Sequence, residues 1–454
     1  MKRLFTSWVR DGANSRGAAV ALALAWAFVH PVAARAQTLT LAEAVDAALA
    51  AHPSLAAAQA RVEAAGGAGD AARAARLPGA SVDATLTRFQ EPMVVAPFHS
   101  LDFGDPPTFD RSLVQGRLGL AYTLFDGGER SSRIRGADAT YEATRFGRAA
   151  TEMSVIEETA AAYVGVLSAE ALLEAAVAQV ESLEEEADRA QRRFDAGTAA
   201  ELEVLRARAT LQEARAQLAS AEARVGLSVR ALARLMGVDA AAVSPAALAD
   251  VSASATPDAS RAEEGATSPI VLQADRAALA AEARLSQERA GRLPTVQAGA
   301  GLLDFGTLDG AHVAEWQAGL QVSWPLFTGG ARSASVRRAQ AELTAARSDL
   351  DAARLQVAQA VDAAETAVVE ADARAEALEL AVVQWEEVAR IEALALEAGS
   401  GVQGDLLRAE AGLFQARAGH ARARYDAVLS RIRLARADGT LDRTWMDEAL
   451  EASR

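Results

Sequence analysis

The chain has 454 residues and a formal net charge of −15, from 46 basic and 61 acidic residues, which argues against nucleic acid as a partner. It is 51% hydrophobic but only 5% aromatic, and it contains no cysteine, which excludes disulfides and a lipid carried on an N-terminal cysteine. An alanine-rich chain with many Glu and Arg residues favours long helices packed closely together.

The N-terminus has the pattern of an export signal. A basic stretch precedes a short apolar run at 18–29, and Ala34 and Ala36 are small residues at the usual cleavage spacing. We therefore predict a secretory signal peptide over 1–36, with Gln37 as the mature N-terminus; a retained membrane anchor is the alternative. No apolar run of 18 residues follows, which predicts that no helix spans a membrane.

The rest of the chain reads as two copies of one pattern. Three motifs recur in order, namely Arg-Leu-Pro at 76–78 and 292–294, Leu-Phe-x-Gly-Gly at 124–128 and 326–330, and x-x-Ala-Gly at 194–197 and 396–399. The first pair is 216 residues apart and the other two are 202 apart. A shared offset over such a length predicts a tandem duplication.

The predicted organisation follows from these offsets. The signal peptide at 1–36 precedes a first repeat over 37–237 and a second over 267–439. A linker or small insertion at 238–266 joins them, and a C-terminal tail covers 440–454.

Each repeat is expected to run helix, strand, loop, strand, long helix, turn and return helix. Leading helices are predicted at 41–76 and 268–291, and return helices at about 200–236 and 403–437. No proline interrupts 129–195, and the equivalent stretch has a heptad seam of small apolar residues. Each long helix would have about 67 residues and measure roughly 100 Å.

The starts of the long helices carry capping signals. Asp126 and Thr328 are the predicted N-caps, and Glu129 is expected to complete a capping box in the first repeat.

Four segments alternate apolar and polar residues, at 81–89, 113–124, 295–304 and 314–324. Each has about the ten residues that a membrane-spanning β-strand needs. The polar positions are predicted to line a lumen, and they are Asp83, Gln115, Arg117, Gln297, Glu315, Gln317 and Gln321. Tyr122, Trp316 and Trp324 are the predicted membrane-interface aromatics. An ordinary half-buried sheet of a soluble domain is the alternative for any single strand.

Four strands cannot close a barrel, and a sheet in lipid cannot leave an edge unpaired. The chain must therefore oligomerise. Two copies would supply eight strands and three would supply twelve, and strand counting does not choose between them.

The Leu-Pro before each first strand, the Leu-Phe-x-Gly-Gly after each second strand and the Ala-Gly tips resemble the TolC family of outer-membrane efflux proteins. The resemblance covers essentially the whole mature chain. It implies a mainly α protein with a transmembrane β-barrel portion. Long antiparallel coiled-coil hairpins would form a periplasmic tunnel, and four strands per chain would contribute to a trimeric 12-stranded barrel.

The same resemblance implies the partners and the location. A homotrimer would sit among outer-membrane lipids and reach into the periplasm. It would meet a periplasmic adaptor (membrane fusion) protein and an inner-membrane pump of the RND, ABC or MFS type. No cofactor is implied.

In such families the hairpin tips contact the adaptor, which here implies Ala196, Gly197, Thr198, Ala199, Ala398, Gly399, Ser400, Gly401 and Val402. The family places an acid six residues after each tip glycine, and Glu203 and Asp405 match as candidate gate residues. Arg206 and Arg408 stand at equivalent positions and are candidate partners for these acids. Three positions depart from the family pattern: Arg408 replaces a frequent acid, Gly401 replaces an arginine, and Leu396 replaces an aromatic residue. A solvated helix face with weak ion pairs is the alternative interpretation.

The sequence shows no catalytic constellation, and the five histidines lack metal-ligand spacing. We therefore expect neither an enzyme nor a metal site. The expected function is an exit duct that passes small molecules or secreted polypeptides. A soluble periplasmic coiled-coil adaptor or structural protein is the alternative.

Overall fold

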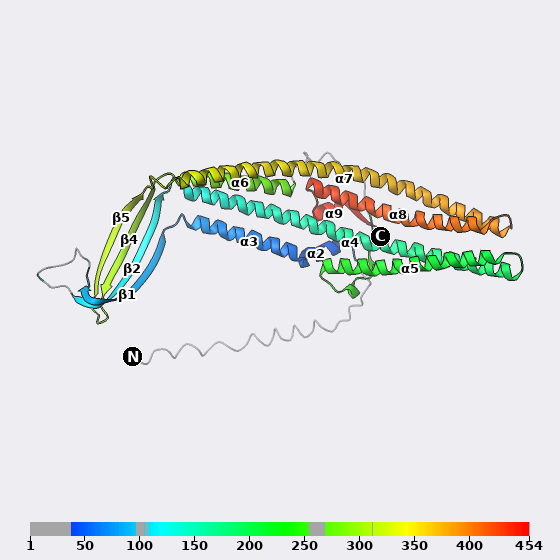
Figure 1. Cartoon of the computed structure of the whole chain (residues 1–454), viewed down its shortest axis with the longest axis horizontal. Helices are drawn as coiled ribbons and strands as arrows, with labels where there is room; N and C mark the ends of the chain where they lie inside the picture. The colour runs from blue at the N-terminus through cyan, green and yellow to red at the C-terminus, as the bar shows by residue number, and fades with distance from the viewer. Residues whose placement is uncertain (1–37, 97–103, 105–107, 254–267, 311, 454) are drawn as a thin grey trace, which may run out of the picture.

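A computed structural model describes residues 38–96, 104, 108–253, 268–310 and 312–453. The predicted signal peptide at 1–36 lies outside these residues, as do most of the loop after the first strand, residues 254–266 of the linker and residue 267. The molecule is elongated, with a sheet at one end and the turns of two long helical hairpins at the other (Figure 1).

The helices dominate the structure. They are α2 (Leu41–Ala51), α3 (Pro53–Ala74), α4 (Glu129–Asp195), α5 (Glu201–Met236), α6 (Pro269–Ala290), α7 (Ala331–Glu397), α8 (Gln403–Asp438) and α9 (Arg443–Ala449). Two short 3-10 helices, η2 (Ala240–Ala242) and η3 (Pro245–Ala247), precede a small strand, β3 (Asp250–Ala253). The predicted long helix at 129–195 is confirmed, and α7 has the same 67 residues.

The two predicted leading helices differ. The second matches α6 to within a residue at each end, but the first is broken into α2 and α3 at His52. Pro53 lacks an N–H and therefore begins a new helix, and His52 before it takes an extended backbone conformation (ψ 122°). The expectation of one continuous helix over 41–76 was wrong because it passed over this proline.

The predicted caps of the long helices also need correction. The N-cap residues are Gly128 and Gly330, with φ of 90° and 85°, and neither long helix has a side-chain cap. The Asp126 carboxylate accepts hydrogen bonds from the N–H groups of Gly128 (3.0 Å) and Arg130 (3.2 Å) from outside the helix. A tight left-handed turn thus displaces Asp126 and Thr328 from the capping position, and Glu129 completes no capping box.

The large sheet has four antiparallel strands in the order β1 (Gly79–Val94), β2 (Phe109–Phe125), β4 (Thr295–Gly306) and β5 (His312–Ser323). Directly paired residues lie on the same face, and the faces alternate along each strand. One row across the sheet is Val82, Leu118, Leu302 and Trp316, and the next row, on the opposite face, is Asp83, Arg117, Leu303 and Glu315. The four predicted strands are confirmed, with β1 and β2 longer at the loop end than expected.

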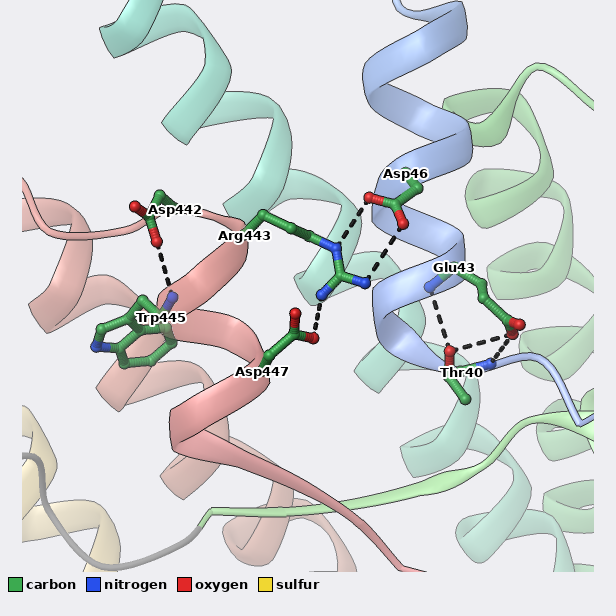
Figure 2. Close-up of polar contacts among 7 residues, drawn as sticks. All are labelled: Thr40, Glu43, Asp46, Asp442, Arg443, Trp445 and Asp447. Atoms are coloured by element: carbon green, nitrogen blue, oxygen red, sulfur yellow. Dashed lines mark hydrogen bonds and ion pairs between the residues drawn. The ribbon is translucent and has the colours of Figure 1, made fainter.

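The largest core lies midway along the helices, where α2, α4, α5, α8 and α9 meet. Figure 2 shows how α9 joins α2, the first helix among the described residues: the Arg443 guanidinium donates to Asp46 of α2 (2.9 Å) and also pairs with Asp447. Strand β6 (Leu450–Ser453) then pairs antiparallel with β3. The C-terminal tail therefore belongs to this core and ties the two ends of the described chain together.

Among the described residues, α4 contains an 18-residue window with mean hydropathy 1.5 and at most two charged residues, which by length and composition alone could cross a membrane. This window averages over polar residues and is not the uninterrupted apolar run whose absence was expected, so the expectation that no helix spans a membrane stays a prediction. The helix packs against α2, α3, α5, α6 and α8, and fully buried residues such as Tyr163 and Val166 supply part of the central core. Packing within the protein explains this apolar content.

Tyr163 gives a test of how the central core holds the two segments around Leu39 and Ala249. Its buried hydroxyl lies 2.7 Å from the carbonyl oxygens of both Leu39 and Ala249. Tyr163→Phe should leave these carbonyls without that donor and loosen both segments, at a net cost of about 1 kcal/mol. We expect the backbone amides of Leu39 and Ala249 to exchange hydrogen roughly five- to tenfold faster.

Tyr141→Phe on the same helix is the control for that measurement, because its ring contacts Arg145 on the helix surface. Unchanged exchange in Tyr163→Phe, equal to this control, would contradict a tethering role for Tyr163.

Candidate functional site: the hairpin tips and the strand wall

Each hairpin tip is a five-residue turn between two long helices. At the first tip Gly197 has φ 73°, and the Thr198 N–H donates to the Arg193 carbonyl (2.8 Å). At the second, Gly399 has the same φ, and the Ser400 N–H donates to the Ala395 carbonyl (3.0 Å). These bonds satisfy helix-end carbonyls, and the left-handed glycine reverses the chain. The predicted adaptor-contact residues at 196–199 and 398–402 therefore form the extreme end of the molecule (Figure 1).

Gly401 shows why the second tip departs from the family pattern. A Cβ at this position would lie 2.7 Å from the backbone nitrogen of Leu396, closer than real side chains allow. The Gly401 N–H also donates to the Ala395 carbonyl (2.8 Å), which holds the turn against the end of α7. The arginine of the family pattern could not adopt this backbone conformation without moving the tip.

The candidate gate acids stand in the first turns of the two return helices. Asp405 pairs with Arg408 one turn along α8, with 2.5 Å between Oδ1 and Nη2. Glu203 lies 3.7 Å from Arg193 across the first hairpin. Arg206, the other candidate cation, is exposed on α5 and belongs to neither pair.

Sequence reasoning missed a buried polar contact between the hairpins. Glu186 of α4 and Gln403 of α8 are both 4% exposed, and the Gln403 amide donates to the Glu186 carboxylate (3.1 Å). Burial raises the pKa of Glu186, while the hydrogen bond from Gln403 and the charge of Arg189 oppose that shift. Ser182 donates to Glu410 (2.9 Å) between the same two helices. The only sequence signal was a glutamate in a seam otherwise built of Leu183, Ala187 and similar residues.

Alternation and pairing place all seven predicted lumen residues on one face of the sheet. Tyr122 and Trp316 lie on the other face, beside exposed apolar residues such as Val82 and Leu320. Trp324 follows the end of β5, where its indole N–H donates to the Arg292 carbonyl (3.3 Å). The sheet therefore has one polar and one apolar face. The lumen and interface assignments stay predictions.

Three comparisons agree with this geometry. A family model for outer membrane efflux proteins matches residues 44–238 and 263–440. Protein CyaE of Bordetella pertussis is 29% identical over 425 residues, which cover 92% of this chain and 87% of that protein. Outer membrane protein TolC of Vibrio cholerae is 27% identical over 320 residues, 68% of this chain and 71% of that protein. The crystal structure of the Vibrio cholerae outer membrane protein VceC superposes with a TM-score of 0.76 at 22% identity, covering 88% of this chain and 96% of that one.

Two helical hairpins with a four-stranded antiparallel sheet at their far end are the fold of the solved outer membrane protein VceC. The chain belongs to the outer membrane efflux protein family. It is the outer-membrane exit duct of a tripartite export system, and it reaches into the periplasm. It works as a homotrimer with a periplasmic adaptor and an inner-membrane pump. The alternative of a soluble adaptor or structural protein is therefore wrong.

The buried Glu186 leads to a pH prediction. Because the pKa of Glu186 is raised, the folded state holds a proton on this carboxyl group more readily than the unfolded state does. Ionisation of Glu186 therefore lowers the stability of the fold as the pH rises above the ordinary pKa of a glutamate. Glu186→Gln keeps an acceptor for Gln403 without a charge. We expect the purified variant to unfold about 2 °C higher than wild type at pH 7, and the difference to vanish below about pH 4.

Glu184→Gln is the matched control, because Glu184 lies on the same helix but is half exposed and pairs with Arg215 (2.7 Å). A Glu186→Gln variant that unfolds at a lower temperature at pH 7 would show that the charged carboxylate and Arg189 stabilise the tip instead.

Proposed function

We propose that the chain is a passive, gated duct that catalyses no reaction and consumes no energy itself. The observation that carries this proposal is the position of an acid in the first turn of each return helix, beside the tips and at the end opposite the sheet. Glu203 and Asp405 are ion-paired within their own chain, each with a partly exposed carboxylate. In this proposal ion pairs between these acids and arginines hold the tips shut, and three copies of each acid around one axis attract cations.

In this proposal the tips at 196–199 and 398–402 receive the adaptor, and its engagement with the pump separates them. Arg193 and Arg408 neutralise part of the acid ring, while exposed Arg206 remains available to a neighbouring chain or to the adaptor. Cargo then passes along the polar face of the sheet, where Gln115, Gln317 and their neighbours keep the wall hydrated. Both small molecules and secreted polypeptides suit a polar, hydrated wall of this kind. Among the described residues no group of three or more potential metal ligands occurs.

The gate is tested by replacing both acids. In planar bilayers, Glu203→Ala combined with Asp405→Ala should raise the closed-state conductance of the trimer several-fold, because the ion pairs that hold the tips are lost. It should also weaken the preference for cations, because the ring of negative charge is lost.

The matched control combines Glu184→Ala with Asp351→Ala. Glu184 pairs across the first hairpin with Arg215 (2.7 Å), and Asp351 pairs one turn along α7 with Arg354 (3.3 Å). The control variant therefore removes the same two kinds of ion pair, but away from the tips. Equal conductance in wild type and in the tip variant would remove both acids from the gate.

A further inference from the structure

The turn that leads from the sheet into a long helix has the same backbone in both repeats. The residue before the helix is a glycine with φ of 90° at α4 and 85° at α7. The Glu129 N–H donates to the Asp126 carbonyl (3.2 Å), and 202 residues later the Ala331 N–H donates to the Thr328 carbonyl (3.1 Å). The two turns therefore present the same backbone N–H groups at the helix start, and their side chains can be compared position by position.

In the first repeat the chain fills this turn with a negative charge of its own. The Asp126 carboxylate accepts hydrogen bonds from the N–H groups of Gly128 (3.0 Å) and Arg130 (3.2 Å) and from the Arg130 Nε (2.5 Å). Burial raises the pKa of Asp126, but these hydrogen bonds outweigh it and hold that pKa below its ordinary value. The turn is therefore built to stabilise an anion.

In the second repeat the donors remain and the carboxylate does not. Thr328 stands at the position of Asp126, and the first turn of α7 contains no acid. The guanidinium of Arg332, at the position of Arg130, has one nitrogen, Nη1, that is shielded from solvent without a hydrogen-bond partner. Among the described residues, no hydrogen bond satisfies this guanidinium or the N–H groups of Gly330 and Arg332. An arginine in the first turn also adds to the positive end of the helix dipole, so this helix start lacks a compensating anion.

The imbalance of charge extends beyond the turn. Residues 124–139 contain three acids and three arginines, whereas the equivalent residues 326–341 contain three arginines and no acid, a local charge of +3. Arg338 lies 3.6 Å from Glu342, but Arg332 and Arg337 form no ion pair among the described residues. In a chain with a net charge of −15, such an excess indicates complementarity to an anion from outside the chain.

The turn before α7 belongs to the apolar side of the sheet. In the first repeat the guanidinium carbon of Arg130 lies 6.0 Å from the centre of the Tyr122 ring, and Tyr122 is on the apolar face. The offset of 202 relates these two residues to Arg332 and Trp324. The unsatisfied donors therefore stand beside a tryptophan on the apolar side and away from the polar wall.

The same turn lies where the apolar face ends. It joins β5 to α7 at the junction of the sheet with the helices (Figure 1). Leu326 and Phe327, directly before Thr328, are 80% and 89% exposed. Because the helices reach into the periplasm, this junction is at the periplasmic boundary of the outer membrane. Aromatic residues gather at such boundaries, at the depth of the lipid headgroups.

We propose that the start of α7 binds the phosphate group of an anionic phospholipid in the periplasmic leaflet, with one lipid per subunit. The phosphate accepts hydrogen bonds from the N–H groups of Gly330 and Arg332 and from the Arg332 guanidinium, as the Asp126 carboxylate does in the first repeat. The acyl chains cover Leu326 and Phe327, which an inorganic phosphate ion could not do. The site lies at the opposite end of the helices from the tips, so it is independent of the proposed gate.

Thr328→Asp tests the site without removing a donor, because it gives the second turn the carboxylate of the first. The measurement is native mass spectrometry of the detergent-solubilised trimer, stripped of lipid and titrated with phosphatidylglycerol. Wild type should bind one lipid per subunit. Thr328→Asp should weaken that binding roughly tenfold or more, because the new carboxylate takes the hydrogen bonds and repels the phosphate, and Arg332→Gln should weaken it similarly.

Arg337→Gln is the matched control, because it removes the same charge from the same helix outside the turn. It should bind the lipid within about twofold of wild type, since an exposed charge contributes little. Equal weakening by Arg337→Gln and Arg332→Gln would show attraction by local charge alone and overturn the site, as would wild-type affinity in Thr328→Asp. An excess of inorganic phosphate should leave the lipid bound. Its displacement by phosphate would identify a site for free anions and overturn the assignment to lipid. The mass of each variant confirms that the trimer is intact.

Discussion

The structure depends on one unsatisfied requirement, the two unpaired edges of a four-stranded sheet. In lipid no water can replace the missing hydrogen bonds, so the sheet is stable only when other subunits cover both edges. The helices also require contacts with other subunits, although an exposed helix face costs less free energy than an unpaired strand edge in lipid. Their seams consist largely of alanine and small aliphatic residues, so each contact buries little area and several helices must share it. Residues such as Val369 of α7 are exposed in the single chain. Assembly is therefore part of folding for this chain.

The duplication explains how the chain tolerates unequal repeats. The difference between the offsets of 216 and 202 falls between the Leu-Pro and Gly-Gly motifs, where β1 and β2 have 16 and 17 residues and β4 and β5 have 12 each. Extra length at the loop end of a hairpin leaves its base in place. The helices beyond the sheet keep identical lengths, because an insertion there would shift every later residue around the seam.

Much of this architecture could be predicted from sequence because its signals are local and repeated. The lack of prolines and the heptad seam predicted the long helices, and the alternation of apolar and polar residues predicted the strands. The failures have local causes too, since Pro53 divides the first helix and the Gly-Gly turn displaces Asp126 from the cap. Glu186 could not be found in this way. Its burial depends on Gln403, 217 residues along the chain, and no periodicity reports a contact of that range.

That buried contact also distinguishes the two repeats from each other. The offset of 202 relates Glu186 to Val388 and Gln403 to Glu201, so the hydrogen-bonded pair within the chain has an apolar and an exposed acidic counterpart on the outer sides. Farther along, Ser182–Glu410 becomes Gln384 and Arg208. The backbone geometry of the repeats is retained while the side-chain chemistry near the tips is not. The two hairpins of one chain therefore differ in side-chain chemistry near the tips, at the end where we propose that the duct opens.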